Sequence, residues 1–184
     1  MKVRDTSLAG LKIIEPKVFG DDRGFFYEIY QEHRYQDMGI KETFVQDNYS
    51  RSSRNVLRGL HFQKLNPQGK LVSVLRGEVF DVAVDLRPNS ETFGKHESII
   101  LSAENKLQFY IPPGFAHGFC VLSEVAEFHY KCTDFYDPND ECGLIWNDPT
   151  LDINWPIDCP LLSEKDSDLP KLNDILAKLK NNWK

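Results

Sequence analysis

The chain has 184 residues, enough for one domain with a sizeable core, and its 41% hydrophobic and 12% aromatic content excludes a disordered chain. Its net charge of −6 argues against a nucleic-acid binder, because such proteins usually present a basic surface. No apolar run reaches the roughly 18 residues of a membrane-spanning helix, and the first residues lack the apolar segment of a signal peptide, so we expect a cytoplasmic protein.

The N-terminal part of the chain alternates short apolar segments with polar ones. We expect a strand at 11–14, a polar turn at 19–24 and an aromatic strand at 25–30. Residues 31–38 are polar and predict a short helix that ends at Gly39, because glycine commonly follows a helix C-terminus.

The next predicted strand, 44–50, carries two amides. Alternation places Gln46 and Asn48 on the same face as Phe44. Two amides on an otherwise inward face indicate a lined cavity rather than a dry core.

The strand at 56–63 is apolar overall but carries Arg58 and His61, and Lys70 follows soon after. An arginine is costly to bury without a partner, and a histidine can exchange protons near neutral pH. Together these residues predict a pocket for an anionic ligand that gives up a proton, although a lone histidine could instead be a satisfied core residue. In a regular strand Arg58 and His61 face opposite ways, so either Gly59 lies in a bulge or Arg58 projects elsewhere.

The central block continues with further apolar segments, which predict strands at 71–75, 79–86, 98–101, 107–111, 115–122 and 125–132. Turns recur roughly every 8 to 12 residues with no long helical pattern between them, which is typical of a β-sandwich or barrel. No repeat, low-complexity segment or linker divides the chain.

Alternation within these strands sorts the polar residues by face. His117 and Tyr130 are expected inside, and His129 outside. For Tyr130 alone, a packing tyrosine whose hydroxyl finds a carbonyl is an equal alternative. Asp81 and Asp85 share one face of their strand and are expected to have structural or supporting roles.

The C-terminal third changes character. Residues 146–160 are loop-like, whereas apolar residues after Pro170 recur at helical spacing and predict one amphipathic helix on the barrel. Asp166 precedes this helix, three residues after Ser163, where an aspartate could cap a helix.

Four cysteines, Cys120, Cys132, Cys142 and Cys159, contain no Cys-x-x-Cys pair. This spacing indicates neither a zinc clip nor a redox motif. Free thiols are typical of a reducing, cytoplasmic environment.

Seven long motifs occur in order: F-G-D-x-R-G-F-F at 19–26, F-V-Q-D-N at 44–48, N-V-L-R-G-L-H-F-Q at 55–63, G-K-L-V at 69–72, F-D-V-A-V-D at 80–85, I-P-x-G-F-A-H-G-F at 111–119 and A-E-F-x-Y-K at 126–131. Through them the chain resembles the dTDP-4-dehydrorhamnose 3,5-epimerase family over almost its whole length. These are cofactor-independent cupin enzymes of dTDP-L-rhamnose synthesis.

The resemblance implies a mainly β fold, a cupin-type jelly-roll barrel or sandwich with a short C-terminal helical segment. It divides a single domain of 1–184 into dimerising strands at about 1–30, a barrel core at 40–135 and a C-terminal helix at 160–184. Family members pair through N-terminal strands, and the strand at 11–14 is poorly placed to find a partner in its own chain. We therefore expect a homodimer in which this strand adds to a neighbour's sheet edge.

The resemblance also implies the activity: epimerisation at C3 and C5 of dTDP-4-dehydro-6-deoxy-D-glucose to dTDP-4-dehydro-L-rhamnose, which feeds O-antigen or cell-wall polysaccharides. His61 is then the base and Asp166 the carboxylate that orients it. Tyr130 delivers a proton from the opposite face, and Lys70 lies near the carbonyl oxygen. No nucleic acid or membrane partner is implied.

Further positions fall where the family contacts its nucleotide-sugar: Arg23, Glu28, Gln46, Asp47, Asn48, Arg58, Lys70, His117, Glu141 and Lys165. Two departures stand out. The loop between His61 and Lys70 is one residue shorter than usual, which could shift Lys70. Phe135 stands where many members have a tyrosine, so stacking on the nucleotide base could differ.

Metal binding is the main chemical alternative, because small barrels of this kind often hold iron, zinc or manganese. Metal-binding cupins carry a His-x-His pair, whereas Gln63 replaces the second histidine here, and Lys70 would repel a cation. We therefore expect neither a metal nor a cofactor. The alternative functions are an epimerase acting at C3 or C5 only or on a related 4-keto-6-deoxy nucleotide sugar, and a non-catalytic sugar-binding barrel.

Overall fold

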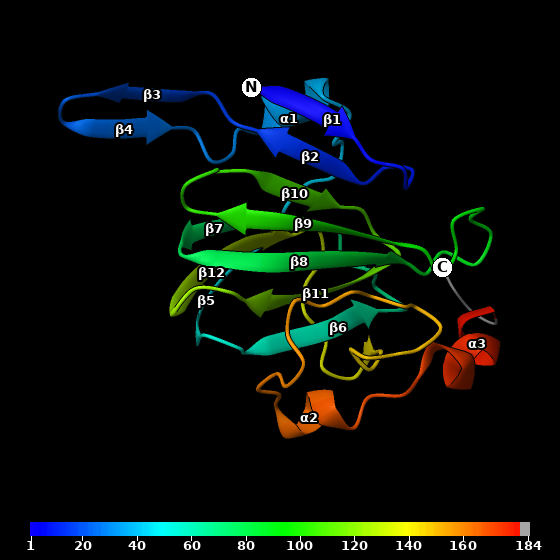
Figure 1. The fold of residues 1–184 in the computed structure, drawn as a ribbon. Helices are drawn as coiled ribbons and strands as arrows, with labels where there is room; N and C mark the ends of the chain where they lie inside the picture. Colours follow the sequence, from blue (N-terminus) through cyan, green and yellow to red (C-terminus); the bar gives the residue numbers. More distant parts are fainter. Residues whose placement is uncertain (181–184) are drawn as a thin grey trace.

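The computed structural model describes residues 1–180, in which two antiparallel sheets face each other (Figure 1). The six-stranded sheet contains, in spatial order, β1 (Lys2–Asp5), β2 (Lys12–Glu15), β10 (Gln108–Ile111), β7 (Lys70–Arg76), β12 (Val125–Cys132) and β5 (Gln46–Ser53). The five-stranded sheet contains β13 (Glu141–Gly143), β6 (Leu57–Gln63), β11 (Phe115–Val121), β8 (Glu78–Asp85) and β9 (His96–Ser102). This is the β-sandwich expected from the sequence.

Three short helices accompany the sheets in this part of the chain: α1 (Glu32–Asp37), α2 (Glu164–Ser167) and α3 (Leu172–Lys180). Figure 1 shows α1 beside β1 and β2 at one end of the molecule, and α2 and α3 at the opposite end. Among residues 1–180, no helix is long and apolar enough to cross a membrane.

The main core lies between the two sheets, because alternation sends every second side chain of each strand inward. Phe109 and Phe128 enter from the six-stranded sheet and Phe119 from the five-stranded sheet. The rings of Phe119 and Phe128 stack with centroids 4.2 Å apart. These aromatic contacts join the two sheets at the base of the site described below.

Both outer faces carry smaller apolar clusters. On the six-stranded sheet, Tyr35 of α1 packs with Ile14 and Tyr110. On the five-stranded sheet, Leu172 and Leu179 of α3 are buried against the strands, as the amphipathic pattern predicts.

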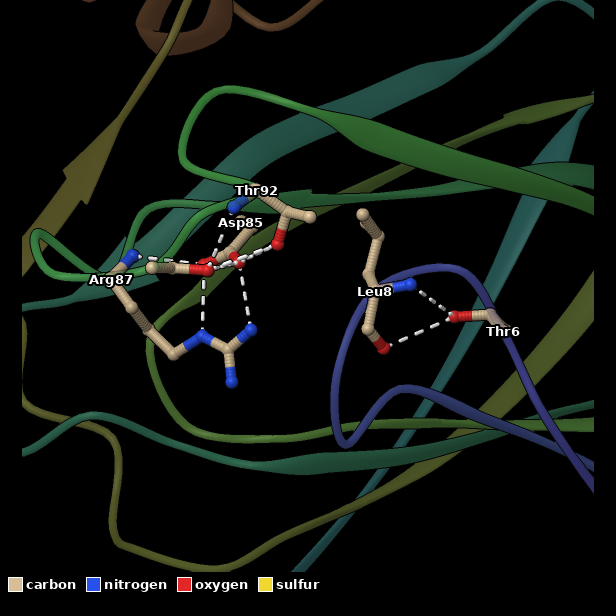
Figure 2. Close-up of polar contacts among 6 residues, drawn as sticks. Thr6, Leu8, Asp85, Arg87 and Thr92 are labelled. Atoms are coloured by element: carbon tan, nitrogen blue, oxygen red, sulfur yellow. Dashed lines mark hydrogen bonds and ion pairs between the residues drawn. The ribbon is translucent and has the colours of Figure 1, made fainter.

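Asp85, at the end of β8, has the structural role expected of it. Its carboxylate accepts hydrogen bonds from Arg87, Ser90 and Thr92, and Figure 2 shows the contacts with Arg87 and Thr92. Burial alone would raise the pKa of Asp85, but these hydrogen bonds outweigh it and hold the pKa below its ordinary value. The network fixes the turn that connects β8 to β9.

Three local expectations are wrong. The segment at 19–24 is not simply a turn, because β3 (Val18–Asp21) and β4 (Gly24–Tyr27) form a hairpin that extends to one side of the body (Figure 1).

The second concerns Phe44, which packs with the outer cluster around Tyr35 and does not share the inward face of β5.

The third concerns the strand near residues 11–14. As β2 it pairs with β1 on one side and β10 on the other, so it has both partners within its own chain. No strand was expected at 2–5, and β10 lies almost a hundred residues after β2, so neither partner was anticipated.

Candidate active site

A cleft of about 300 Å³ opens at one end of the sandwich, between the inner faces of the two sheets. Its walls are formed by Gln46, Asn48, His61, Phe62, Gln63, Gln68, Lys70, Tyr130, Cys132, Tyr136 and Glu141. Most of these side chains are polar, so the cleft is suited to a polar ligand, in agreement with the lined cavity expected from Gln46 and Asn48.

His61 and Asp166 form a close pair at this cleft. Nε2 of His61 lies 2.5 Å from Oδ1 of Asp166, which is buried, whereas the histidine side chain is 27% exposed. Burial alone would raise the pKa of Asp166, but the hydrogen bond and charge of His61, with a bond from Ser163, keep the pKa lowered. The carboxylate is therefore ionised and can stabilise a protonated imidazole.

Asp166 is not the N-cap of the helix. That position belongs to Ser163, whose hydroxyl accepts a hydrogen bond from the backbone N–H of Asp166. The cap starts α2, and α2 packs against β6, which carries His61. Local capping chemistry thus aims Asp166 at the histidine.

Gly59 lies in a bulge of β6. A bulge was one of the two alternatives expected from the alternation of Arg58 and His61. In the pairing with β11, His117 faces His61 but Phe119 faces Arg58, so β6 contains one extra residue. Gly59 has φ +108°, and a Cβ there would lie 2.6 Å from the carbonyl oxygen of His117. The bulge turns Arg58 toward β5, where its Nε donates to Ser52 at 3.1 Å.

Tyr130 lines the cleft from β12, in the opposite sheet from His61. Burial raises its pKa above the ordinary value, and the nearby charge of Arg58 opposes this only in part. The phenol is therefore protonated at neutral pH and able to donate a proton.

Lys70 begins β7 and lies between Cys132 and Ile111 of the neighbouring strands. Burial lowers its pKa, while the charges of Asp81 and Glu141 act in the opposite direction. Its side chain lines the cleft, as the sequence predicts.

A chain of hydrogen bonds orients the amides of the cleft. The backbone N–H of Tyr136 donates to Oε1 of Gln46, and Nε2 of Gln46 donates to Oδ1 of Asn48. Nδ2 of Asn48 then faces the sulfur of Cys132 at 3.5 Å. Asp47, between the two amides, points outward and pairs with Lys131.

The rim of the cleft is held by Glu141, which forms an ion pair with Lys165 and accepts a hydrogen bond from the Tyr136 hydroxyl at 2.6 Å. Burial would raise the pKa of Glu141, but both partners lower it overall. Lys165 lies beside Asp166 in α2. The helix therefore contributes to the rim as well as to the histidine pair.

Other candidates lie outside this cleft. His117 is buried behind it and bonds to Asp81, with Nε2 3.0 Å from each carboxylate oxygen. Arg23 lies at the tip of the β3–β4 hairpin and pairs with Asp21, and Glu28 pairs with Arg34 at 3.2 Å. In this single chain, neither Arg23 nor Glu28 is among the residues that line the cleft.

Five residues that line the cleft were not predicted to do so from the sequence: Phe62, Gln63, Gln68, Cys132 and Tyr136. Cys132 was detectable, because it shares the inward face of β12 with Tyr130. Tyr136 and Gln68 come from loops, where no alternation rule applies.

Gln63 occupies the position where metal-binding cupins have their second histidine, and its amide makes hydrogen bonds within the fold. Its Nε2 donates to the carbonyls of Asn66 and Phe135, and its Oε1 accepts from the backbone N–H of Asp137. Across residues 1–180, no group of three His, Cys, Asp or Glu side chains is arranged to hold a metal ion.

Comparison with known proteins gives a consistent result. The family model described as dTDP-4-dehydrorhamnose 3,5-epimerase matches residues 5–174. Two curated proteins of that name are similar: the one from Pseudomonas aeruginosa is 58% identical over 90% of this chain and 93% of its own, and the one from Neisseria gonorrhoeae is 55% identical over 90% of this chain. The chain spans about half the length of the latter, 51%.

A solved structure has the same fold as this chain. The dTDP-6-deoxy-D-glucose-3,5-epimerase of Legionella pneumophila, in complex with dTDP-4-keto-L-rhamnose, is 57% identical, with a TM-score of 0.94 over 97% of this chain and 96% of its own. The sandwich is therefore of the cupin-like type seen in such epimerases.

Proposed function

This chain belongs to the dTDP-4-dehydrorhamnose 3,5-epimerase family, and we propose that its cleft catalyses the reaction of that name. The substrate is dTDP-4-dehydro-6-deoxy-D-glucose, and the product, inverted at C3 and C5, is dTDP-4-dehydro-L-rhamnose. The observation that supports this most is the pairing of His61 with Asp166 in a cleft that Tyr130 lines from the opposite sheet.

The first step is removal of a proton next to the C4 ketone, where the carbonyl makes the C–H bond acidic. Because Nε2 of His61 faces the carboxylate of Asp166, the neutral ring carries its proton on Nε2 and its lone pair on Nδ1. Nδ1 accepts the substrate proton, and Asp166 stabilises the imidazolium that forms. A positioned general base typically contributes about 10² to 10⁴ in rate.

The second requirement is stabilisation of the negative charge that develops on the C4 oxygen. Lys70 supplies a preorganised cation at the wall of the cleft, and such electrostatic stabilisation is usually the largest single catalytic contribution. Tyr130 then returns a proton to the face opposite His61, which inverts the carbon. Solvent then takes the proton from His61 and returns one to Tyr130, so that the same residues can act again at the second carbon.

The nucleotide end of the substrate is assigned to the polar wall and rim. Gln46, Asn48 and Glu141 line the cleft, and Lys165 and Arg58 bring positive charge near it. Asp47 and His117 act indirectly, since Asp47 holds Lys131 on the outer face and His117 bonds to Asp81 behind the cleft.

We expect the reaction to need no metal, because both polar atoms of the Gln63 amide are engaged with the backbone. Dialysis against a strong chelator should leave the turnover number unchanged. Activity that disappears and returns on addition of iron, zinc or manganese would contradict this expectation.

A homodimer is the proposed assembly. The β3–β4 hairpin extends from the body and exposes Phe25 and Phe26, whose exposed fractions are 62% and 69%. Apolar surface of this kind is typical of a protein–protein contact. Sedimentation at micromolar concentration should give twice the 21.3 kDa chain mass.

Proton NMR with the 4-keto nucleotide sugar in D₂O tests the activity directly. A 3,5-epimerase incorporates deuterium at both C3 and C5 and inverts both carbons. Incorporation at C3 alone would identify a single-site epimerase, and incorporation at neither would identify a sugar-binding barrel. The proposed setting is a cytoplasmic pathway that supplies rhamnose for O-antigen or cell-wall polysaccharides.

A further inference from the structure

We propose that Asp140 is a positioning residue that holds the nucleotide-binding rim of the cleft in place. It is buried, with 5% of its surface exposed, although it belongs to a surface loop. Its carboxylate accepts hydrogen bonds from three consecutive backbone N–H groups, those of Lys64, Leu65 and Asn66, at 2.8–3.1 Å. This inference rests on the proposed function, since the rim matters only if a ligand binds there.

The contact requires a carboxylate rather than a polar side chain in general. Three successive N–H groups that point at one place form an anion-binding concavity in the backbone. Both carboxylate oxygens are used, with Leu65 donating to each at 2.9 Å. An asparagine offers only one acceptor oxygen and turns its NH₂ group toward donors, which leaves at least one buried N–H without a partner.

Asp140 joins two segments that are otherwise far apart in the sequence. One is the loop at 64–66, which follows His61 on β6, and the other is the segment at 135–141, which carries Tyr136 and Glu141 into the rim. Gln63 supports the same junction through its bonds to Phe135 and Asp137. The Asp140 carboxylate thus adds to the pairing of β13 with β6, in which Glu141 faces Gln63, and ties the loop at 64–66 to the segment that leads into β13.

The proton-handling groups are held by other contacts. Lys70 is fixed by the β7 pairing and by the bond from the N–H of Gly69 to Oγ1 of Thr133 at 2.7 Å. His61 is fixed by its strand and by Asp166. Loss of Asp140 should therefore weaken ligand binding and leave the chemical step almost unchanged.

Asp148 provides a matched control. It is another buried aspartate, 2% exposed, and it also binds loop backbone: the N–H groups of Thr150, at 2.6 Å, and Leu172, at 2.5 Å. It lies in the loop between β13 and α2 and does not line the cleft. Its replacement removes the same kind of interaction at a place where no ligand is expected.

The test compares D140N and D148N with the parent chain, with dTDP as the binding probe in calorimetry and the 4-keto sugar as the substrate. For D140N we expect dTDP affinity to fall by about tenfold and KM to rise by a similar factor, the scale of losing one charge-assisted hydrogen bond. We expect kcat to stay within about twofold of the parent value. D148N should lower the melting temperature and leave both dTDP affinity and KM unchanged.

Unchanged dTDP affinity in D140N, or an equal loss in D148N, overturns the proposal, and so does a loss confined to kcat. If D140N does not fold, D140E replaces it: the charge remains but the carboxylate is displaced by one methylene, so an intermediate loss of affinity is expected, and parent-like affinity counts against the proposal.

If the parent chain itself binds no dTDP, the assigned ligand is wrong, and hydrogen exchange then decides about Asp140. In D140N the amides of both 64–66 and 135–141 should exchange faster, whereas in D148N they should not. Parent-like exchange at either segment overturns the coupling.

Discussion

Two histidine–carboxylate pairs lie on neighbouring strands of this molecule, and only one of them faces the cleft. His61 of β6 and His117 of β11 are directly opposite each other in the strand pairing. His61 meets Asp166 at 2.5 Å and its side chain is 27% exposed, whereas His117 meets Asp81 at 3.0 Å and its side chain is 8% exposed. The chemical groups are the same, so access to the cleft separates their functions.

The origin of each carboxylate explains the difference. Asp81 lies on β8, next to β11, and reaches His117 across the inner face of the sheet, where both are surrounded by the core. Asp166 comes from α2, outside the sandwich, and approaches His61 from the edge of the cleft. A partner from outside the sheet leaves one side of the imidazole open, whereas a partner from within the sheet does not.

The environment of the buried pair also affects its protonation. Burial lowers the pKa of His117, and the charges of Lys70 and His61 lower it further, against the opposing effect of Asp81. His117 is therefore neutral at pH 7 and holds a hydrogen bond. The buried pair therefore supports the fold, whereas in the proposed function the open pair moves protons.

The largest expected effect is that of H61A. Without the base no proton leaves the sugar, so deuterium incorporation and product formation should both fall by about 10⁴, the upper end of what one positioned base contributes. Proton NMR in D₂O measures both. H117N, as the matched variant of the other pair, should retain incorporation within about tenfold, and a loss as large as that of H61A would remove the distinction between the pairs.

Y130F should separate the two proton transfers. His61 still removes a proton and returns a solvent proton to the same face, so deuterium should enter at C3 while inverted product falls by about 10² or more. The same NMR experiment reports exchange and inversion separately. Product formation as fast as in the parent would mean that Tyr130 only packs against Phe128 and that another group is the acid.

D166N and D81N compare the two carboxylates directly. D166N should lower kcat by about 10², because His61 loses the group that fixes its tautomer and stabilises its charge. D81N should lower kcat only about tenfold, through the weaker support of the Lys70 charge, but should lower the free energy of unfolding by about 2 kcal/mol. Urea denaturation and steady-state kinetics on both variants measure this, and the reverse order of the two effects on kcat contradicts it.

The smallest expected effect is a pH dependence of stability that comes from the buried pair. Since the folded-state pKa of His117 lies below the ordinary 6.5, the unfolded chain binds the proton more readily. The contribution to stability is full above about pH 6.5 and is lost as the pH falls through the folded-state pKa, by at most about 1.4 kcal/mol per pH unit. Urea unfolding at pH 7.5 and 5.5 should show a shallower dependence in H117N, and an unchanged slope would mean that other groups cause it.

Much of the fold could be predicted from the local alternation of residues along each strand. Alternation placed Gln46, Asn48 and Tyr130 on inward faces and His129 outside, and the structure has them so. The failures come from packing between elements: β1 and β10 occupy the two edges of β2, and Phe44 packs with Ile14, Tyr35 and Tyr110 on the outer face. No local pattern contains that information.

For the site, the sequence by itself determined which kinds of groups are present: a histidine, a lysine and a tyrosine on separate strands, with amides beside them. Only the tertiary structure decided which carboxylate serves which histidine. The local sequence around Asp166 indicated a helix cap, and only the family resemblance assigned Asp166 to His61, while Asp81 had no partner assigned. The N-cap at Ser163, the bulge at Gly59 and the pairing of β6 with β11 decided the matter, because a hydrogen bond depends on distances between atoms that the order of residues along the chain does not specify.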